Sequence, residues 1–90
     1  MGVDINGKDR EGWSALMVAA YCGHRDLVKF LLNAGAAIDD RDSYGYTALM
    51  HAVYRGHKDS VALLLERGAD IHAKIDIYSK VSIEITAESI

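Results

Sequence analysis

The sequence predicts an all-α protein built from stacked helix pairs, and three observations support this fold class. Residues 4–36 and 37–69 align without a gap and are identical at 16 of the 33 aligned positions. A fixed period of this length indicates one structural unit stacked on copies of itself. Within each copy, apolar residues recur at helical spacing and glycines separate the apolar segments. We therefore expect a helical solenoid of about two and a half repeats, forming one domain over residues 1–90.

Each copy is expected to begin with a polar turn that leads into a short first helix. Gly12 and Gly45 lie in polar stretches, where glycine permits the positive φ of a tight turn. Ser14 and Thr47 follow two residues later, and a hydroxyl at that place accepts a hydrogen bond from an unpaired helix amide. The apolar residues that come next have the i, i+3, i+4 spacing of a helix face: Leu16, Ala19, Ala20 in one copy and Leu49, Ala52, Val53 in the other.

A second helix is expected after each Gly-His pair. Gly23-His24 and Gly56-His57 end the first helix, and Gly35 and Gly68 end the second as C-terminal caps. The apolar face of the second helix consists of Leu27, Val28, Leu31 and Leu32 in the first copy and of Val61, Leu64 and Leu65 in the second. The repeating unit is therefore turn, short helix, loop, longer helix, turn.

These motifs resemble the ankyrin repeat. Ser14-Ala15-Leu16-Met17 and Thr47-Ala48-Leu49-Met50 stand where the family has Thr-Pro-Leu-His, and Gly23-His24-x-Asp26-x-Val28 with Leu31-Leu32-x2-Gly35-Ala36 matches the rest of the unit. The resemblance covers repeat 1, residues 4–36, and repeat 2, residues 37–69. It implies a non-enzymatic, scaffold-like module for protein–protein interaction that needs no cofactor. In the family the histidine of the Gly-His pair is structural, because its ring satisfies backbone groups of the loop.

The segment 70–90 permits two interpretations. If one residue is inserted at Ile75, the segment follows the repeat as a divergent partial copy, with a helix over 81–89 and Ser79 in place of the turn glycine. The residues themselves alternate apolar with polar from Ile71 to Ala87 and are rich in β-branched types, which favours strand and an exposed edge. The repeat context makes the helix the preferred prediction.

Composition and spacing exclude several classes of function. The net charge of −3 provides no basic stripe for nucleic acid, and no apolar run approaches the 18 or so residues of a membrane span. The single Cys22 precludes an internal disulfide and favours a reducing compartment, cytoplasm or nucleus. The four histidines lack the spacing of a zinc site. The hydroxyls and aspartates that catalysis would require are accounted for by caps and turns, so we expect neither metal nor enzymatic activity.

Aromatic and charged residues at the turns are the candidate partner-binding residues. In the ankyrin family the turn tips and the exposed face of the first helix form a concave groove that binds partners. The candidates at these places are Arg10, Glu11, Trp13, Tyr21, Ser43, Tyr44, Tyr46, Tyr54, Arg55 and Tyr78. Tyrosine, tryptophan and arginine dominate binding hot spots, and we expect Trp13, Tyr44, Tyr46 and Tyr54 to be the anchors. The alternative is that some of these rings pack on adjacent turns and stiffen the array.

A second function hypothesis concerns the ends of the array. Helix pairs of this kind bury their faces mainly on the next pair, so about three repeats are usually needed for stability. Leu27 and Phe30 of the first repeat lack a preceding neighbour. The chain is then a structural piece of a longer array that self-associates, as a homo-oligomer, through its uncapped ends or its alternating tail.

Overall fold

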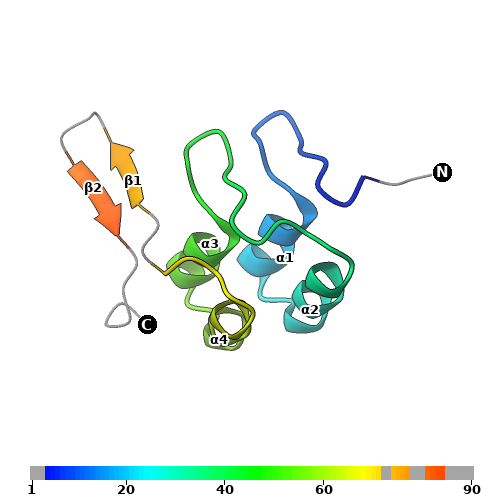
Figure 1. Ribbon diagram of the computed structural model, residues 1–90. Coiled ribbons are helices and arrows are strands. Elements are labelled where there is room, and N and C mark those ends of the chain that lie inside the picture. Colours follow the sequence, from blue (N-terminus) through cyan, green and yellow to red (C-terminus); the bar gives the residue numbers. More distant parts are fainter. Residues whose placement is uncertain (1–3, 72–73, 78–80, 85–90) are drawn as a thin grey trace.

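The computed structural model describes residues 4–71, 74–77 and 81–84. Within these ranges the chain forms four helices, which are α1 (Ala15–Cys22), α2 (Arg25–Asn33), α3 (Ala48–Arg55) and α4 (Lys58–Glu66). Helix α1 packs against α3, and α2 packs against α4, so that the two helix pairs stand side by side (Figure 1). The predicted solenoid of stacked helix pairs is confirmed.

The first helix of each repeat begins at the predicted hydroxyl residue. The Ser14 Oγ accepts a hydrogen bond from the backbone N–H of Met17, and the Thr47 Oγ1 accepts one from Met50, both at 3.3 Å. In the first repeat the bond is reciprocated, because the Met17 sulfur accepts from the Ser14 N–H at 3.4 Å. Each hydroxyl satisfies an amide that the helix itself leaves unpaired, a contribution of about 1 kcal/mol to helix stability.

Left-handed glycines end α1 and α3, as predicted. Gly23 has a φ of 76° and Gly56 a φ of 75°, and the N–H of each bonds back to carbonyls in the last turn of its helix. The second helices end one residue earlier than predicted, at the caps Ala34 and Arg67, and a glycine of positive φ follows each cap. The two repeats therefore use the same local signals to start and stop each helix.

The core lies within and between the two helix pairs. Ala19, Ala20 and Ala52 are fully buried, and their small side chains let α1 and α3 approach closely. Larger side chains such as Leu49 and Leu64 fill the space beside them and are almost completely shielded from water. Each such leucine contributes roughly 1.5–3 kcal/mol of hydrophobic free energy.

The C-terminal segment forms a β-hairpin, which corrects the preferred prediction of a helix over 81–89. Strand β1 (Lys74–Ile77) pairs antiparallel with β2 (Val81–Glu84), in the register Lys74↔Glu84 and Ile77↔Val81. The helix is wrong for 81–84, and residues 85–89 lie outside the described residues. Beta-branched side chains lose rotamer freedom in a helix, and a short helix that lacks the second helix of its pair is marginal in water. The period-two pattern therefore prevails over the repeat register here.

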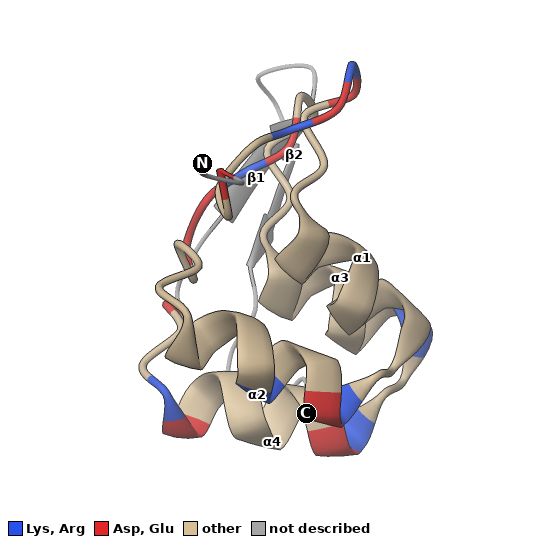
Figure 2. Cartoon of the chain, turned by 90° about the vertical axis from the view of Figure 1, so that its right-hand side faces the viewer, with Lys and Arg blue, Asp and Glu red and all other residues tan. Residues whose placement is uncertain are grey.

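The hairpin continues the row of turns rather than the row of helices. In Figure 1 the two polar turns before α1 and α3 stand beside one another above the helices, and β1 and β2 follow in the same row. Figure 2, turned by 90°, shows the turns above the layer of helices. The structure therefore has two layers, one of turns and strands and one of helices.

Candidate functional site

An aspartate holds each polar turn in shape. The Asp9 Oδ1 accepts hydrogen bonds from the backbone N–H groups of Glu11 and Trp13, both at 2.9 Å. Asp42, which is 33 residues further on, makes the same pair of bonds at the same distance to the N–H groups of Tyr44 and Tyr46. A carboxylate that binds two amides fixes the local backbone. Each turn therefore presents its aromatic residues from a rigid base.

The two turns are also bonded to each other. The Ser43 N–H donates to the Glu11 carbonyl at 3.0 Å, and the Lys8 ammonium donates to the Arg41 carbonyl at 2.9 Å. Gly12 lies so close to the second turn that a Cβ there would stand 2.6 Å from the Ser43 nitrogen. The turns consequently form one continuous surface, in which the first turn is held against the second.

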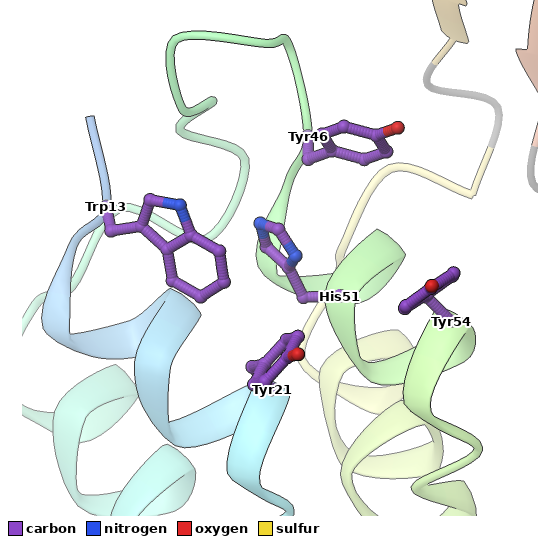
Figure 3. A pocket seen from close by; sticks show the side chains of 5 residues that line it. All are labelled: Trp13, Tyr21, Tyr46, His51 and Tyr54. Atoms are coloured by element: carbon purple, nitrogen blue, oxygen red, sulfur yellow. The ribbon is translucent and has the colours of Figure 1, made fainter. Parts of the chain in front are cut away.

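Five rings line a hollow between the turns and the first helices (Figure 3). Two come from the turns and three from α1 and α3: Trp13, Tyr46, Tyr21, His51 and Tyr54. The hollow has a volume of about 270 Å³. This is close to the lower end of small-ligand pockets, which begin at about 300 Å³. A space of this size holds one side chain of a partner rather than a large cofactor.

His51 lies at the centre of the aromatic hollow. Its ring centroid is 4.1 Å from that of Trp13 with an interplanar angle of 32°, and 5.4 Å from that of Tyr46 with an angle of 37°. Tyr21 closes the lower side, edge-on to Trp13 at 5.3 Å. Trp13 and Tyr46 also pack against the hydrophobic core. Ring packing across two repeats therefore shapes the hollow.

A buried hydrogen bond orients His51. The His51 Nε2 lies 3.0 Å from the Asp42 Oδ2, and both side chains are almost fully buried. Burial is the main influence on this imidazole and lowers the pKa of His51, while the hydrogen bond and charge of Asp42 oppose the shift without reversing it. His51 is therefore neutral near pH 7. The Nε2–H donates to Asp42, and Nδ1 has an unshared electron pair that can accept a hydrogen bond.

The rim of the hollow carries an exposed ring and a cation. Tyr54 is 81% exposed, so a partner can cover it without any change in the core. The Arg55 guanidinium lies 4.6 Å from the centroid of the Tyr21 ring, which is cation–π geometry. The face of the Tyr21 ring therefore already binds a cation from the same chain.

The structure brings together half of the residues predicted to bind a partner. Trp13, Tyr21, Tyr46 and Tyr54 line the hollow, and Arg55 lies on Tyr21. Four others are exposed in the turns but do not line the hollow: Arg10, Glu11, Ser43 and Tyr44. Tyr78 lies outside the described residues. The alternative of ring packing also describes part of the group, since Trp13 and Tyr46 contact the core.

His51 is a lining residue that the sequence prediction omitted. Sequence reasoning considered it only as a metal ligand, yet among the described residues no group of three His, Cys, Asp or Glu side chains is placed to hold a metal ion. A signal was present in the repeat alignment. In the block Ala-Leu-Met-x-Ala, the variable position is Val18 in the first copy and His51 in the second. One copy has a polar ring where the other has an aliphatic side chain, so the fold does not require a particular residue type at this position.

Charged residues avoid the helices that line the hollow. Figure 2 shows acidic and basic residues at the turn tips, on α2 and α4, and in the loops between helices. Helix α1 has no charged residue, and α3 has only Arg55.

None of the helices in the described part of the chain is long and apolar enough to span a membrane.

Stacked turn–helix–helix units with a hollow between turns and first helices define a helical repeat protein. A family described as "Ankyrin repeats (3 copies)" matches residues 1–75. The chain belongs to the ankyrin repeat family, whose repeats generally mediate protein–protein interaction.

Known proteins match this chain over about one repeat. The Notch-regulated ankyrin repeat-containing protein of Xenopus tropicalis is 55% identical over 32 residues, which are 36% of this chain and 28% of that protein. The ankyrin repeat and SAM domain-containing protein 6 of Rattus norvegicus is 50% identical over 36 residues, 39% of this chain and 4% of that protein. The mitochondrial disaggregase of Homo sapiens is 54% identical over 35 residues, 39% and 5% respectively. The match thus spans less than a third of each relative.

Proposed function

We propose that this chain binds a protein partner through the aromatic hollow and the adjoining turns. The observation that carries the proposal is the hollow itself, with five rings from two repeats and Tyr54 exposed at its rim. Tyrosine and tryptophan bury a large area at a low cost in side-chain entropy. Because hydrogen bonds already hold the turns, little ordering free energy is lost when a partner docks.

The residues have distinct roles in this proposal. Trp13 and Tyr46 form the walls, and Tyr54 with Tyr44, which is 71% exposed, covers the partner from the two sides. Arg10, Glu11 and Ser43 contact the partner around the turn tips, and Arg55 sets the charge preference at the rim.

A Tyr54→Ala variant tests the proposal. Tyr54 makes few contacts that the fold needs, because its side chain is largely exposed. We expect this variant to keep its helicity and to weaken binding of the partner by roughly 1–3 kcal/mol, the usual range for a hot-spot aromatic. The measurement is a pull-down from cell lysate, followed by calorimetry with the captured protein.

Phe30→Ala is the matched control for Tyr54→Ala. Phe30 is also an exposed aromatic residue, but it lies on α2, away from the hollow. Capture that survives Phe30→Ala and is lost with Tyr54→Ala supports recognition through the hollow. Equal capture by both variants contradicts it. If Tyr46→Ala and Tyr54→Ala only unfold the chain and have no separate effect on binding, the rings are structural.

A second candidate function is self-association through the outer face of α1 and α2. Leu27, Phe30 and Val18 are exposed apolar side chains on this face. Their equivalents 33 residues on are Ser60, Leu63 and His51, and all three are buried where the first repeat covers the second. The exposed face therefore has the character of a repeat-stacking surface, which a second copy of the chain fits.

Sedimentation tests self-association. Self-association through this face requires that the mass grows with concentration and that Phe30→Glu abolishes the growth, because a buried carboxylate is costly. A chain without residues 75–90 tests the other route to self-association, which is pairing through the hairpin. If the intact chain stays monomeric at high concentration, both routes are excluded.

A further inference from the structure

We infer that the aromatic hollow takes the side-chain ammonium of a lysine on the protein partner. The inference rests on the proposed function and names the group that the hollow recognises. Four observations carry it: the faces of the rings, the position of Arg55, the hydrogen bond between His51 and Asp42, and the distribution of charge.

The hollow is lined by aromatic rings, and the faces of such rings attract cations. A cation within about 6 Å of a tyrosine or tryptophan face is stabilised by the ring quadrupole. Arg55 already lies 4.6 Å from the Tyr21 centroid, so one tyrosine of the hollow has this environment in the folded chain. Trp13, Tyr46 and Tyr54 line the remainder of the hollow and have no such cation among the described residues.

His51 supplies a hydrogen-bond acceptor in the same space. His51 is neutral and its one ring proton is on Nε2, which donates to the buried Asp42 carboxylate at 3.0 Å, so Nδ1 carries no proton. Figure 3 shows the ring of His51 in the middle of the hollow, with Trp13 on one side and Tyr46 and Tyr54 on the other. A carboxylate behind the imidazole polarises the ring and makes Nδ1 a stronger acceptor. An ammonium N–H is the complementary donor.

Charge in and around the hollow favours a cation over the other occupants. Asp42, at 1% side-chain exposure, is the buried charge behind the lining, and the described part of α1 and α3 adds only Arg55 at the rim. Arg55 is exposed, so solvent and salt screen its repulsion. An aliphatic side chain would leave Nδ1 without a partner, and a carboxylate would meet both the ring faces and Asp42. The lysine stem, in contrast, packs on the rings while its ammonium reaches Nδ1.

The test compares two probes with the same stem and different charge. Nα-acetyl-lysine methylamide has the ammonium, and Nα-acetyl-norleucine methylamide ends in a methyl group. Trp13 is the only tryptophan of the chain, so its fluorescence and its indole N–H resonance report on the hollow alone. We expect a saturable change with the lysine probe and binding of the norleucine probe at least fivefold weaker.

Two substitutions separate the ring faces from the acceptor. Tyr54→Leu removes an exposed ring, and we expect the affinity for the lysine probe to fall about threefold, as for the loss of one exposed cation–π contact. His51→Phe keeps an aromatic ring and removes Nδ1, and we expect a loss of about tenfold for the lysine probe with no loss for norleucine. Phe30→Ala is the control and leaves both probes unchanged. If His51→Phe does not fold, Tyr54→Leu and the two probes decide.

Some results would overturn the inference and leave the proposed function standing. Norleucine binding as tightly as lysine makes the hollow an apolar pocket, and tighter binding by the corresponding arginine probe replaces lysine with arginine. If neither probe changes the Trp13 signals, lysine recognition is excluded. The pull-down with Tyr54→Ala then shows separately whether the hollow still binds a partner through other contacts.

Discussion

The two repeats are identical at 16 of 33 aligned positions but their helix pairs have different neighbours, and the comparison separates local from tertiary effects. Both begin at a hydroxyl cap and both first helices end at a glycine of almost equal φ. Yet Leu63 on α4 is 3% exposed, whereas its equivalent Phe30 on α2 is 64% exposed. The second pair is covered by the first, and no described element covers the first. Burial, unlike helix formation, thus depends on position in the stack.

The Gly-His pairs show the same difference. The His57 Nε2–H donates to the Tyr21 carbonyl at 2.9 Å, so this ring satisfies backbone in the preceding repeat. His24 is exposed, and the described chain offers it no such preceding carbonyl. The structural role expected for both histidines is therefore met by His57 alone. One motif serves a stacking contact in one copy and faces water in the other.

The largest expected effect is the loss of stability when Leu63 is truncated, compared with truncation of its equivalent Phe30. Leu63→Ala leaves a cavity between α2 and α4, and we expect the free energy of unfolding to fall by about 2–5 kcal/mol. Phe30→Ala removes a larger side chain from an exposed place, so the change stays within about 0.5 kcal/mol. Urea unfolding followed by circular dichroism measures both. Similar losses for the two variants would show that the outer face of α2 is covered in solution.

The next prediction compares Gly23 with Gly56. Alanine at a left-handed position costs roughly 1–2 kcal/mol in either repeat. At Gly23 a Cβ would also stand 2.6 Å from the His57 Nδ1, and the bond to Tyr21 holds that ring in place. At Gly56 nothing lies within 4 Å. We therefore expect Gly23→Ala to destabilise by about 1–3 kcal/mol more than Gly56→Ala, since overpacking adds to the strain. Thermal and urea unfolding of the two variants check this, and equal losses would contradict the close packing of His57 on Gly23.

The smallest expected effect concerns pH and the pair Val18 and His51. Burial lowers the pKa of His51 below its usual 6.5. Between the folded and unfolded pKa values the unfolded chain binds more protons, so stability is full above pH 6.5 and falls as the pH drops through this window. His51→Val, which copies the residue of the first repeat, is expected to flatten that slope. Unfolding in urea at a series of pH values measures it, and an unchanged slope would show that His51 does not titrate in this way.

Much of the fold was predictable because its signals are local. The hydroxyl of Ser14 or Thr47 lies three residues from the amide that it satisfies, and the glycines need only their own φ. Part of the aromatic hollow was also predictable, since Trp13 and Tyr46 belong to the turns. The tail was the error, because the repeat register was preferred to the β-branched alternation of residues 74–84.

The sequence by itself determined the repeat and the family, which are read from aligned residues, and the caps of the first helices, which depend on residues a few positions apart. Only the tertiary structure decided that Trp13 stacks on His51 and that His51 donates to Asp42. The first contact joins residues 38 positions apart and exists because α1 and α3 pack side by side, while the second joins a turn to the helix that follows it, nine positions on. The cause is that stacking distance and burial are properties of two repeats together, while capping and turn formation are properties of one.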